Sequence, residues 1–365
     1  MKKVLSILLC VLLLVSCTNS TDSNQNNSND ENDDPKLVLD VDLKGDLYQV
    51  LIPFTQSKLR NYHSTMTRQD RIELSMRLQE MSSNYFSQEQ YYVSEGTVVD
   101  NNLHNRLIKY ETIYDEGLNP RADQEFETTS VNRTVVGPVI VTDIIELDFY
   151  ESQSEDAPIE GIALAITLNK FSTLEDGTVV ELSEETMVDW GESSARKLVS
   201  IIRSLSGMTN VPIFVALYSL ERQDSTLPGG YVSSAFFEGR SGQFTRNKEQ
   251  WLLFPSDAAT NRVNQLAVEF DLYRQSLSSL IAAETTGVIA SGRLINGTVD
   301  YLKIEINTAG RTFLELQALT QYAANLLDRF SNFDIDITVQ IKVVDEVVSI
   351  ISLENDSQEA TIVYF

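Results

Sequence analysis

Residues 161–168 read GIALAITL, and an almost wholly apolar run of this length predicts a buried strand. Farther along, four apolar residues follow one another at helical spacing: Ala195, Leu198, Ile202 and Leu205. A second apolar run, Val211–Leu220, predicts another strand. Strands interleaved with single helices are typical of α+β layers, so this segment indicates an α+β fold.

The same order of elements recurs along the chain. The first copy has strands at Val135–Tyr150, Gly161–Leu168, Val211–Leu220 and Tyr231–Phe237 around that helix. The second copy has strands at Gly287–Ile295, Tyr301–Ile306, Ile335–Leu353 and Ala360–Phe365 around a helical stripe of Leu316, Ala323, Leu327 and Phe330. The pattern predicts two tandem repeats of strand-strand-helix-strand-strand type, with helices packed on mainly antiparallel sheets. Chance recurrence of common elements is the alternative.

Two further helices are expected outside these copies. Arg68–Phe86 carries Leu74, Leu78, Met81 and Tyr85 on one stripe, with Thr67 as its expected N-cap. Between the copies, a longer stripe is formed by Val263, Leu266, Phe270, Tyr273, Leu277 and Leu280. This stripe either packs on its own sheet or offers a coiled-coil face, and we favour packing on its own sheet.

The N-terminus has the features of an export signal. Lys2 and Lys3 precede the apolar run Val4–Val15, which is shorter than the about 20 residues of a membrane-spanning helix. The run ends in Leu14, Val15, Ser16 and Cys17, which resembles the lipobox of bacterial lipoproteins. The resemblance implies that a diacylglyceryl transferase lipidates Cys17 and that signal peptidase II cuts before it. An ordinary export signal and a retained anchor are the alternatives.

The composition changes after Cys17. Thr18–Asp34 contains no apolar residue and is expected to be a disordered tether. We therefore divide the chain into a signal peptide at 1–16, the lipidated Cys and tether at 17–35, a first repeat domain at 36–245 and a second at 246–365. If Cys10 leaves with the signal and Cys17 carries lipid, the mature domain has no thiol for a disulfide or a metal.

The charge of the chain excludes several classes of partner. It has 53 acidic and 28 basic residues, a formal net charge of −25. No basic stripe offsets this background, which argues against nucleic-acid binding. Hydrophobic residues make up 42%, an ordinary globular value that rules out a wholly disordered chain.

Motifs for catalysis or metal binding are incomplete. His63 and His104 have no second ligand at zinc spacing, so we expect no metal and no cofactor. Ser194 and Lys197 fit Ser-x-x-Lys without the companion motifs of penicillin-binding proteins. Asp40–Gly45 resembles the start of a calcium loop but has Lys44 at a ligand position.

Two loops are candidates for ligand binding. They are Asn119-Pro120 and Pro228-Gly229-Gly230, in which the glycines allow backbone conformations that binding loops often need. Tight structural connections are the alternative.

Several short motifs occur in a characteristic order. They are Tyr91–Gly96, Gly117–Pro120, Asn210–Tyr218, Pro228–Gly230 and Phe254–Ser256. With the lipobox leader, they make the chain resemble the CamS family of sex-pheromone precursor lipoproteins of Gram-positive bacteria. The resemblance implies a tandem-repeat α+β lipoprotein whose cleaved leader yields a short apolar pheromone.

The corresponding peptide here consists of Cys10, Val11, Leu12, Leu13, Leu14, Val15 and Ser16. It ends in Ser as the family peptide does, but it lacks Phe and gains the Cys10 thiol. Leader debris without activity is the alternative. Our hypothesis is a non-enzymatic protein, lipid-anchored at the extracellular face of the membrane, whose mature domain binds an unknown ligand. A cell-envelope hydrolase is the rival hypothesis.

Overall fold

The fold was analysed in a computed structural model of the whole chain. The structure describes residues 47–52, 54, 56–59, 68–154, 156–222, 224–280, 287–357 and 359–365. Residues 42–365 group into one compact unit. The expected N-cap Thr67 and the tether Thr18–Asp34 lie outside the described residues.

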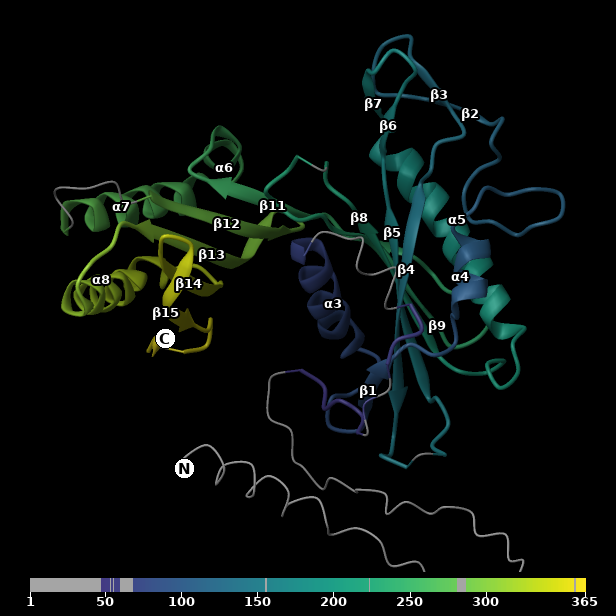
Figure 1. Cartoon of the computed structure of the whole chain (residues 1–365), viewed down its shortest axis with the longest axis horizontal. Helices are drawn as coiled ribbons and strands as arrows, with labels where there is room; N and C mark the ends of the chain where they lie inside the picture. The colour runs from purple at the N-terminus through teal and green to yellow at the C-terminus, as the bar shows by residue number, and fades with distance from the viewer. Residues whose placement is uncertain are drawn as a thin grey trace, which may run out of the picture. The chain divides into compact units, whose positions relative to one another are not determined.

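Two six-stranded sheets organise the described residues (Figure 1). The first sheet has the order β1-β4-β5-β8-β9-β10, comprising Tyr92–Glu95, Val141–Tyr150, Gly161–Leu168, Ile213–Ser219, Gly230–Phe237 and Thr245–Arg246. The second has the order β11-β12-β13-β14-β15-β16, comprising Glu249–Phe254, Gly287–Ile295, Thr298–Thr308, Asp336–Val343, Glu346–Leu353 and Thr361–Tyr364. Two small hairpins pair β2 (Glu125–Glu127) with β3 (Thr134–Val136), and β6 (Phe171–Thr173) with β7 (Val179–Glu181).

Helices accompany both sheets. Those beside the first are α3 (Arg68–Ser82), α4 (Asn101–Leu107) and α5 (Glu184–Arg203). The remainder are α6 (Asp257–Arg262), α7 (Asn264–Leu280), α8 (Phe313–Asn325) and the 3-10 helix η1 (Leu326–Phe330). Side-chain oxygens of Ser183, Ser256 and Thr312 accept backbone N–H groups at the starts of α5, α6 and α8. These caps explain why the helices begin where they do.

The run GIALAITL is buried on both faces because helices cover both faces of the first sheet. Ile162, Leu164 and Ile166 join the core shared with α5, whereas Ala163 and Ala165 join the core shared with α3. Figure 1 shows α3 and α5 on opposite sides of β4 and β5. The small alanines leave room for aromatic rings on the α3 side. There, Phe86 stacks on Phe149 with ring centroids 4.4 Å apart. Tyr85 stacks on Phe236 with ring centroids 4.3 Å apart. The sequence of β5 is therefore that of a central, doubly covered strand.

The second sheet has its apolar core on one face. Along β13 and β14, buried residues alternate with half-exposed ones, and the buried set packs with α7, α8 and η1. The opposite face carries charged side chains such as Lys303, Glu305 and Lys342. Leu266, Phe270, Tyr273 and Leu277 of α7 are in this core, so the stripe packs on its own sheet as we favoured.

The two sheets share one order of strand pairing. Reading along either sheet, the pairings run antiparallel, antiparallel, parallel, antiparallel, antiparallel. In each sheet a helical segment connects the two parallel strands: α5 lies between β5 and β8, and α8 lies between β13 and β14. The architecture is a mixed α+β fold.

Several predicted boundaries need correction. Val135–Tyr150 was expected as one strand, but it breaks into β3 and β4 at Gly137, where φ is +55° and a side chain would meet the Ala122 carbonyl at 2.7 Å. The helix predicted to reach Phe86 ends at Ser82, whose carbonyl accepts the N–H groups of Tyr85 and Phe86 in a tight turn.

Candidate functional site

The leader residues Cys10–Ser16, with the lipobox Leu14–Cys17, lie outside the described part of the chain. Their predicted roles therefore stay predictions. So do those of His63 and Asp40–Gly45, which fall outside the described residues as well.

Asn119 is fully buried and ties three segments together. Its Nδ2 donates to the carbonyls of Ile108 and Val141 at 2.7 and 2.8 Å, and its Oδ1 accepts the N–H groups of Ile140 and Val141 at 2.7 Å each. Two donors and one acceptor atom are thereby used inside the fold. The structure gives Asn119 an architectural task, and ligand contact by Asn119 or by the buried Pro120 stays a prediction.

The side chains of the Ser194-x-x-Lys197 motif bind the loop that contains Asn119. Ser194 Oγ donates to the Leu118 carbonyl at 3.0 Å, and Lys197 Nζ donates to the Gly117 carbonyl at 3.0 Å and to Glu111 Oε1 at 2.7 Å. Both side chains of the motif are hydrogen-bonded to the loop.

His104 forms a buried pair with Asp143. Its Nε2 lies 2.7 Å from Asp143 Oδ1, and the two side chains are 1% and 7% exposed. Asp143 Oδ1 also accepts the N–H of Ile144 at 2.8 Å. Because no substrate reaches a pair so deeply buried, the pair is suited to holding α4 on β4.

Two buried carboxyl groups of β4, those of Glu146 and Asp148, bind the segment that follows the motif Tyr91–Gly96. The sequence reasoning missed this pair. Glu146 accepts the backbone N–H groups of Thr97, Val98 and Val99 at 2.7–3.1 Å. Asp148 Oδ2 accepts the N–H and the hydroxyl of Thr97 at 2.9 and 2.8 Å. Burial, with the neighbouring Glu146 carboxyl second, raises the pKa of Asp148 well above its ordinary value. The available signal was the pair of acids at alternate positions of β4, Glu146 and Asp148, each between apolar residues.

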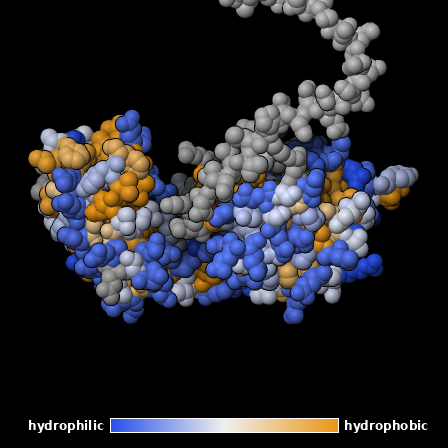
Figure 2. Space-filling view, turned by 90° about the horizontal axis from the view of Figure 1, so that it is seen from below, coloured by the Kyte–Doolittle hydropathy of each residue, from blue (hydrophilic) through white to orange (hydrophobic). Residues whose placement is uncertain are grey.

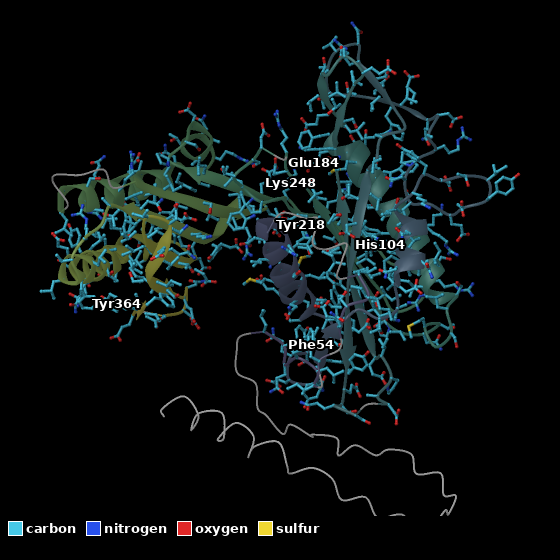
Figure 3. The ribbon with its side chains drawn as sticks, in the orientation of Figure 1. Phe54, His104, Glu184, Tyr218, Lys248 and Tyr364 are labelled. Atoms are coloured by element: carbon cyan, nitrogen blue, oxygen red, sulfur yellow. The ribbon has the colours of Figure 1, made fainter. Side chains whose placement is uncertain are left out.

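The Pro228-Gly229-Gly230 turn lies where three backbone segments meet. A side chain on Gly229 would stand 2.0 Å from the Ser219 carbonyl oxygen, and one on Gly230 would stand 2.3 Å from that of Glu249. The turn lines a small pocket of about 40 Å³ that also touches Glu184 and Lys248, which Figure 3 draws near one another. The glycines are thus required by close backbone approach, and the pocket is of a size for a water molecule or two.

A larger pocket opens beside it, at the carboxyl ends of the parallel strands β5 and β8. Its volume is about 480 Å³. It is lined by Thr142 of β4, by Asn169 and the β6–β7 hairpin, and by Leu220–Arg222 and Asp224 after β8. In open sheets, the crevice beyond the carboxyl ends of parallel strands is a common place for ligands. We call this site the strand-end pocket.

The strand-end pocket combines an aromatic ring with groups of both charges. Phe171 is half-buried, and Lys170, which lines the smaller pocket, has its Nζ 5.2 Å from the Phe171 ring centre. Arg222 donates from Nε and Nη2 to the two oxygens of Asp224 at 3.0 and 2.9 Å. The sequence reasoning missed this site because its residues come from three connections that only the fold brings together.

Comparison with known proteins identifies the family. The family model for the CamS sex pheromone cAM373 precursor matches residues 54–359. The chain belongs to the CamS family. A search of curated proteins gave no match.

Two solved structures resemble this CamS chain. One is the C-terminal domain of the sex pheromone staph-cAM373 precursor from Staphylococcus aureus, with 18% identity, a TM-score of 0.68, and coverage of 81% of this chain and 96% of that one. The other is a sex pheromone precursor from Lactobacillus salivarius subsp. salivarius UCC118, with 19% identity, a TM-score of 0.71, and coverage of 85% and 92%. At these identities, the likeness shows a shared fold.

Two negative findings apply to the described residues. None of their helices has the length and apolar character needed to cross a membrane. They also contain no group of three or more His, Cys, Asp or Glu side chains arranged to hold a metal ion.

Proposed function

We propose that this CamS protein is a surface lipoprotein and pheromone precursor whose folded part binds a saccharide of the cell envelope. The family supports the precursor role. The leader supports the anchor, because Leu14–Cys17 has the lipobox pattern after a short apolar run. Two acyl chains on Cys17 would hold the protein stably at the membrane, whereas one would not.

The peptide half of the proposal uses the same cleavage. Cutting before Cys17 creates a C-terminus at Ser16, so only one further cut, before Cys10, releases the apolar heptapeptide. The peptide lacks the Phe of the family peptide, and its Cys10 thiol is open to oxidation. We expect synthetic, reduced Cys10–Ser16 peptide to trigger plasmid-bearing responder cells. No response at micromolar peptide would contradict this half of the proposal.

The strand-end pocket is the observation that supports ligand binding. Its volume of about 480 Å³ lies within the roughly 300–1,000 Å³ usual for small-ligand sites. A half-buried ring offers an apolar face to a sugar, while carboxylates, a guanidinium and hydroxyls offer hydrogen bonds to its substituents. The presence of both charges favours a neutral, hydroxyl-rich ligand over an ion.

The test is a calorimetric titration of the protein with N,N′-diacetylchitobiose, a neutral disaccharide of N-acetylglucosamine, which is one of the two sugars of peptidoglycan. The unchanged chain should bind it with a Kd between about 1 μM and 1 mM. Ser172→Trp fills the pocket and should weaken binding about tenfold or more. Ser193→Trp, on the exposed side of α5, is the matched control and should leave binding unchanged. No binding by the unchanged chain, or equal loss in both variants, would contradict the proposal.

The proposed organisation of the folded part is a duplicated unit. The shared order of strand pairing supports it, and so does the register of the parallel strands. Ile213 pairs with Ile162 in the first sheet, and Ile337 pairs with Leu302 in the second. At the corresponding later positions, Leu217 pairs with Ile166 and Ile341 pairs with Ile306.

A further inference from the structure

The outer edge of β16 differs from the other three sheet edges. At β1, the segment 49–51 covers the edge: Val93 N–H donates to the Gln49 carbonyl at 2.9 Å, and Leu51 N–H donates to the Val93 carbonyl at 2.7 Å. At the opposite edge of the first sheet, β10 has two residues, and its Arg246 pairs with Asp189 and Glu192. Short length, charge and covering segments are the usual protections of an edge strand.

The second sheet protects one edge in the same way. Strand β11 begins with Glu249, whose carboxylate lies 3.1 Å from Arg77 Nε, and Pro255 follows directly after its end. Strand β16 has no charged residue and no proline between Thr361 and Phe365. It pairs with β15 on one side, and no pairing is found on its other side among the described residues.

The hydrogen-bonding groups at the open edge can be assigned from the register. Phe365 N–H donates to the Val348 carbonyl at 3.0 Å, and Ile350 is opposite Val363. In an antiparallel ladder, bonded and non-bonded pairs alternate, so the N–H and carbonyl groups of Ile362 and Tyr364 point away from β15. These groups form a template for another strand.

Apolar side chains flank this template. Phe313 and Leu314, at the start of α8, are 65% and 72% exposed, and Phe313 lies 6.1 Å from the ring of Tyr364. Val363 and Phe365 are 47% and 77% exposed. The helix layer ends at this edge, so the apolar layer between α8 and the sheet is open at its side. Figure 2 shows that apolar areas interrupt the otherwise polar surface, and Tyr364 is labelled in Figure 3.

We propose that the β16 edge pairs antiparallel with the β16 edge of a second copy of this chain, about a two-fold axis. A two-fold axis perpendicular to the strand relates the two copies of an edge strand in antiparallel orientation. The chain carries a net charge of −25, so most surfaces of two copies repel, whereas the side chains of β16 carry no charge.

The exposed area is also of the right order for a dimer. The five side chains offer roughly 500 Å² per copy, judged from the size of apolar side chains. Two copies would then bury about 1,000 Å² of side-chain surface, and the paired backbone adds to it. Specific interfaces bury about 1,200–2,000 Å² in total, so the β16 contact lies at the lower end of that range.

The test is the mass of the mature chain in solution. The chain from residue 17 with Cys17→Ser retains the compact unit 42–365 and removes any association through lipid. Analytical ultracentrifugation should show a monomer–dimer equilibrium with a Kd on the order of 10 μM. Val363→Lys places a charge at the edge and should raise this Kd about tenfold or more. Val344 lies in the turn between β14 and β15 and is 78% exposed. Val344→Lys is therefore the matched control and should leave the Kd unchanged.

Hydrogen exchange gives a second readout on the same samples. The amides of Ile362 and Tyr364 should exchange more slowly as dimer forms, and Val363→Lys should abolish this protection while the melting temperature stays near that of the unchanged chain. A chain monomeric up to about 100 μM, a dimer insensitive to Val363→Lys, or assemblies larger than a dimer would overturn the proposal. So would a monomer whose β16 amides are protected only by added Cys10–Ser16 peptide, which would make the edge a peptide site.

Discussion

Gly96 shows how one residue sets the geometry of the buried carboxyl pair. A methyl group at this position would lie 2.4–2.6 Å from three atoms of the Glu146 side chain. Gly96→Ala must therefore displace a carboxylate that holds three backbone N–H groups, and overpacking of this kind costs about 1–3 kcal/mol. Urea denaturation should show a loss of that size.

The matched control for this change is Gly239→Ala. No atom lies within 4 Å of a side chain built there, and the backbone is not in the left-handed region. Its free energy of unfolding should stay within about 0.5 kcal/mol of the unchanged chain. Equal effects of the two substitutions would contradict the role given to Gly96.

Asp148 makes stability depend on pH in a definite direction. Because its native pKa is raised, the native state keeps a proton that the unfolded chain releases near pH 4. Above that pH, unfolding releases the proton, so stability falls as pH rises, by up to about 1.4 kcal/mol per pH unit, until the pH passes the native pKa.

Asp148→Asn removes this titration and keeps an oxygen that accepts from Thr97. The free energy of unfolding of the variant, minus that of the unchanged chain, should therefore increase as pH rises from about 4. Asp123→Asn, at a side chain that is 77% exposed, is the control and should give a flat difference. If the difference for Asp148→Asn is flat or decreases with pH, the raised pKa of Asp148 in the native state is contradicted.

At the scale of elements, Asn119 joins the end of α4 to the start of β4. Asn119→Ala would leave two carbonyls and two N–H groups in the interior without these partners. Each such group costs about 1–3 kcal/mol, so the loss should reach about 3 kcal/mol or more in thermal or urea unfolding. The exposed Asn102→Ala on α4 is the control. A loss below 1 kcal/mol for Asn119→Ala would contradict the assignment.

Some strands could be predicted because the burial of their side chains alone determines their residue pattern. Gly161–Leu168 and Gly287–Ile295 have the predicted bounds, since a buried strand and a one-sided strand leave distinct patterns. Periodicity also found α7 and the face it buries.

Other elements were not predicted because tertiary contacts define them. Strand β1 is four residues long and depends on β4 and on the segment 49–51. Strand β11 ends at Phe254, the first residue of the motif Phe254-Pro255-Ser256, whose Ser256 caps α6. The strand-end pocket needs β5 and β8 to be parallel neighbours, and no local pattern shows which strands will pair.

At the scale of the whole molecule, we propose that one chain gives two products. Under this proposal, cleavage before Cys17 would separate a peptide from an anchored protein that carries the strand-end pocket. Cys17→Ala should leave the protein uncleaved or release it into the medium, because no thiol remains to receive the lipid.

The most direct test is mass spectrometry of the producing cells and their medium. The account predicts a membrane-bound mature chain whose first residue is Cys17 with a diacylglyceryl group, and a peptide in the medium whose last residue is Ser16. An unmodified N-terminus downstream of Cys17, or a mature chain that still contains Ser16, would contradict it.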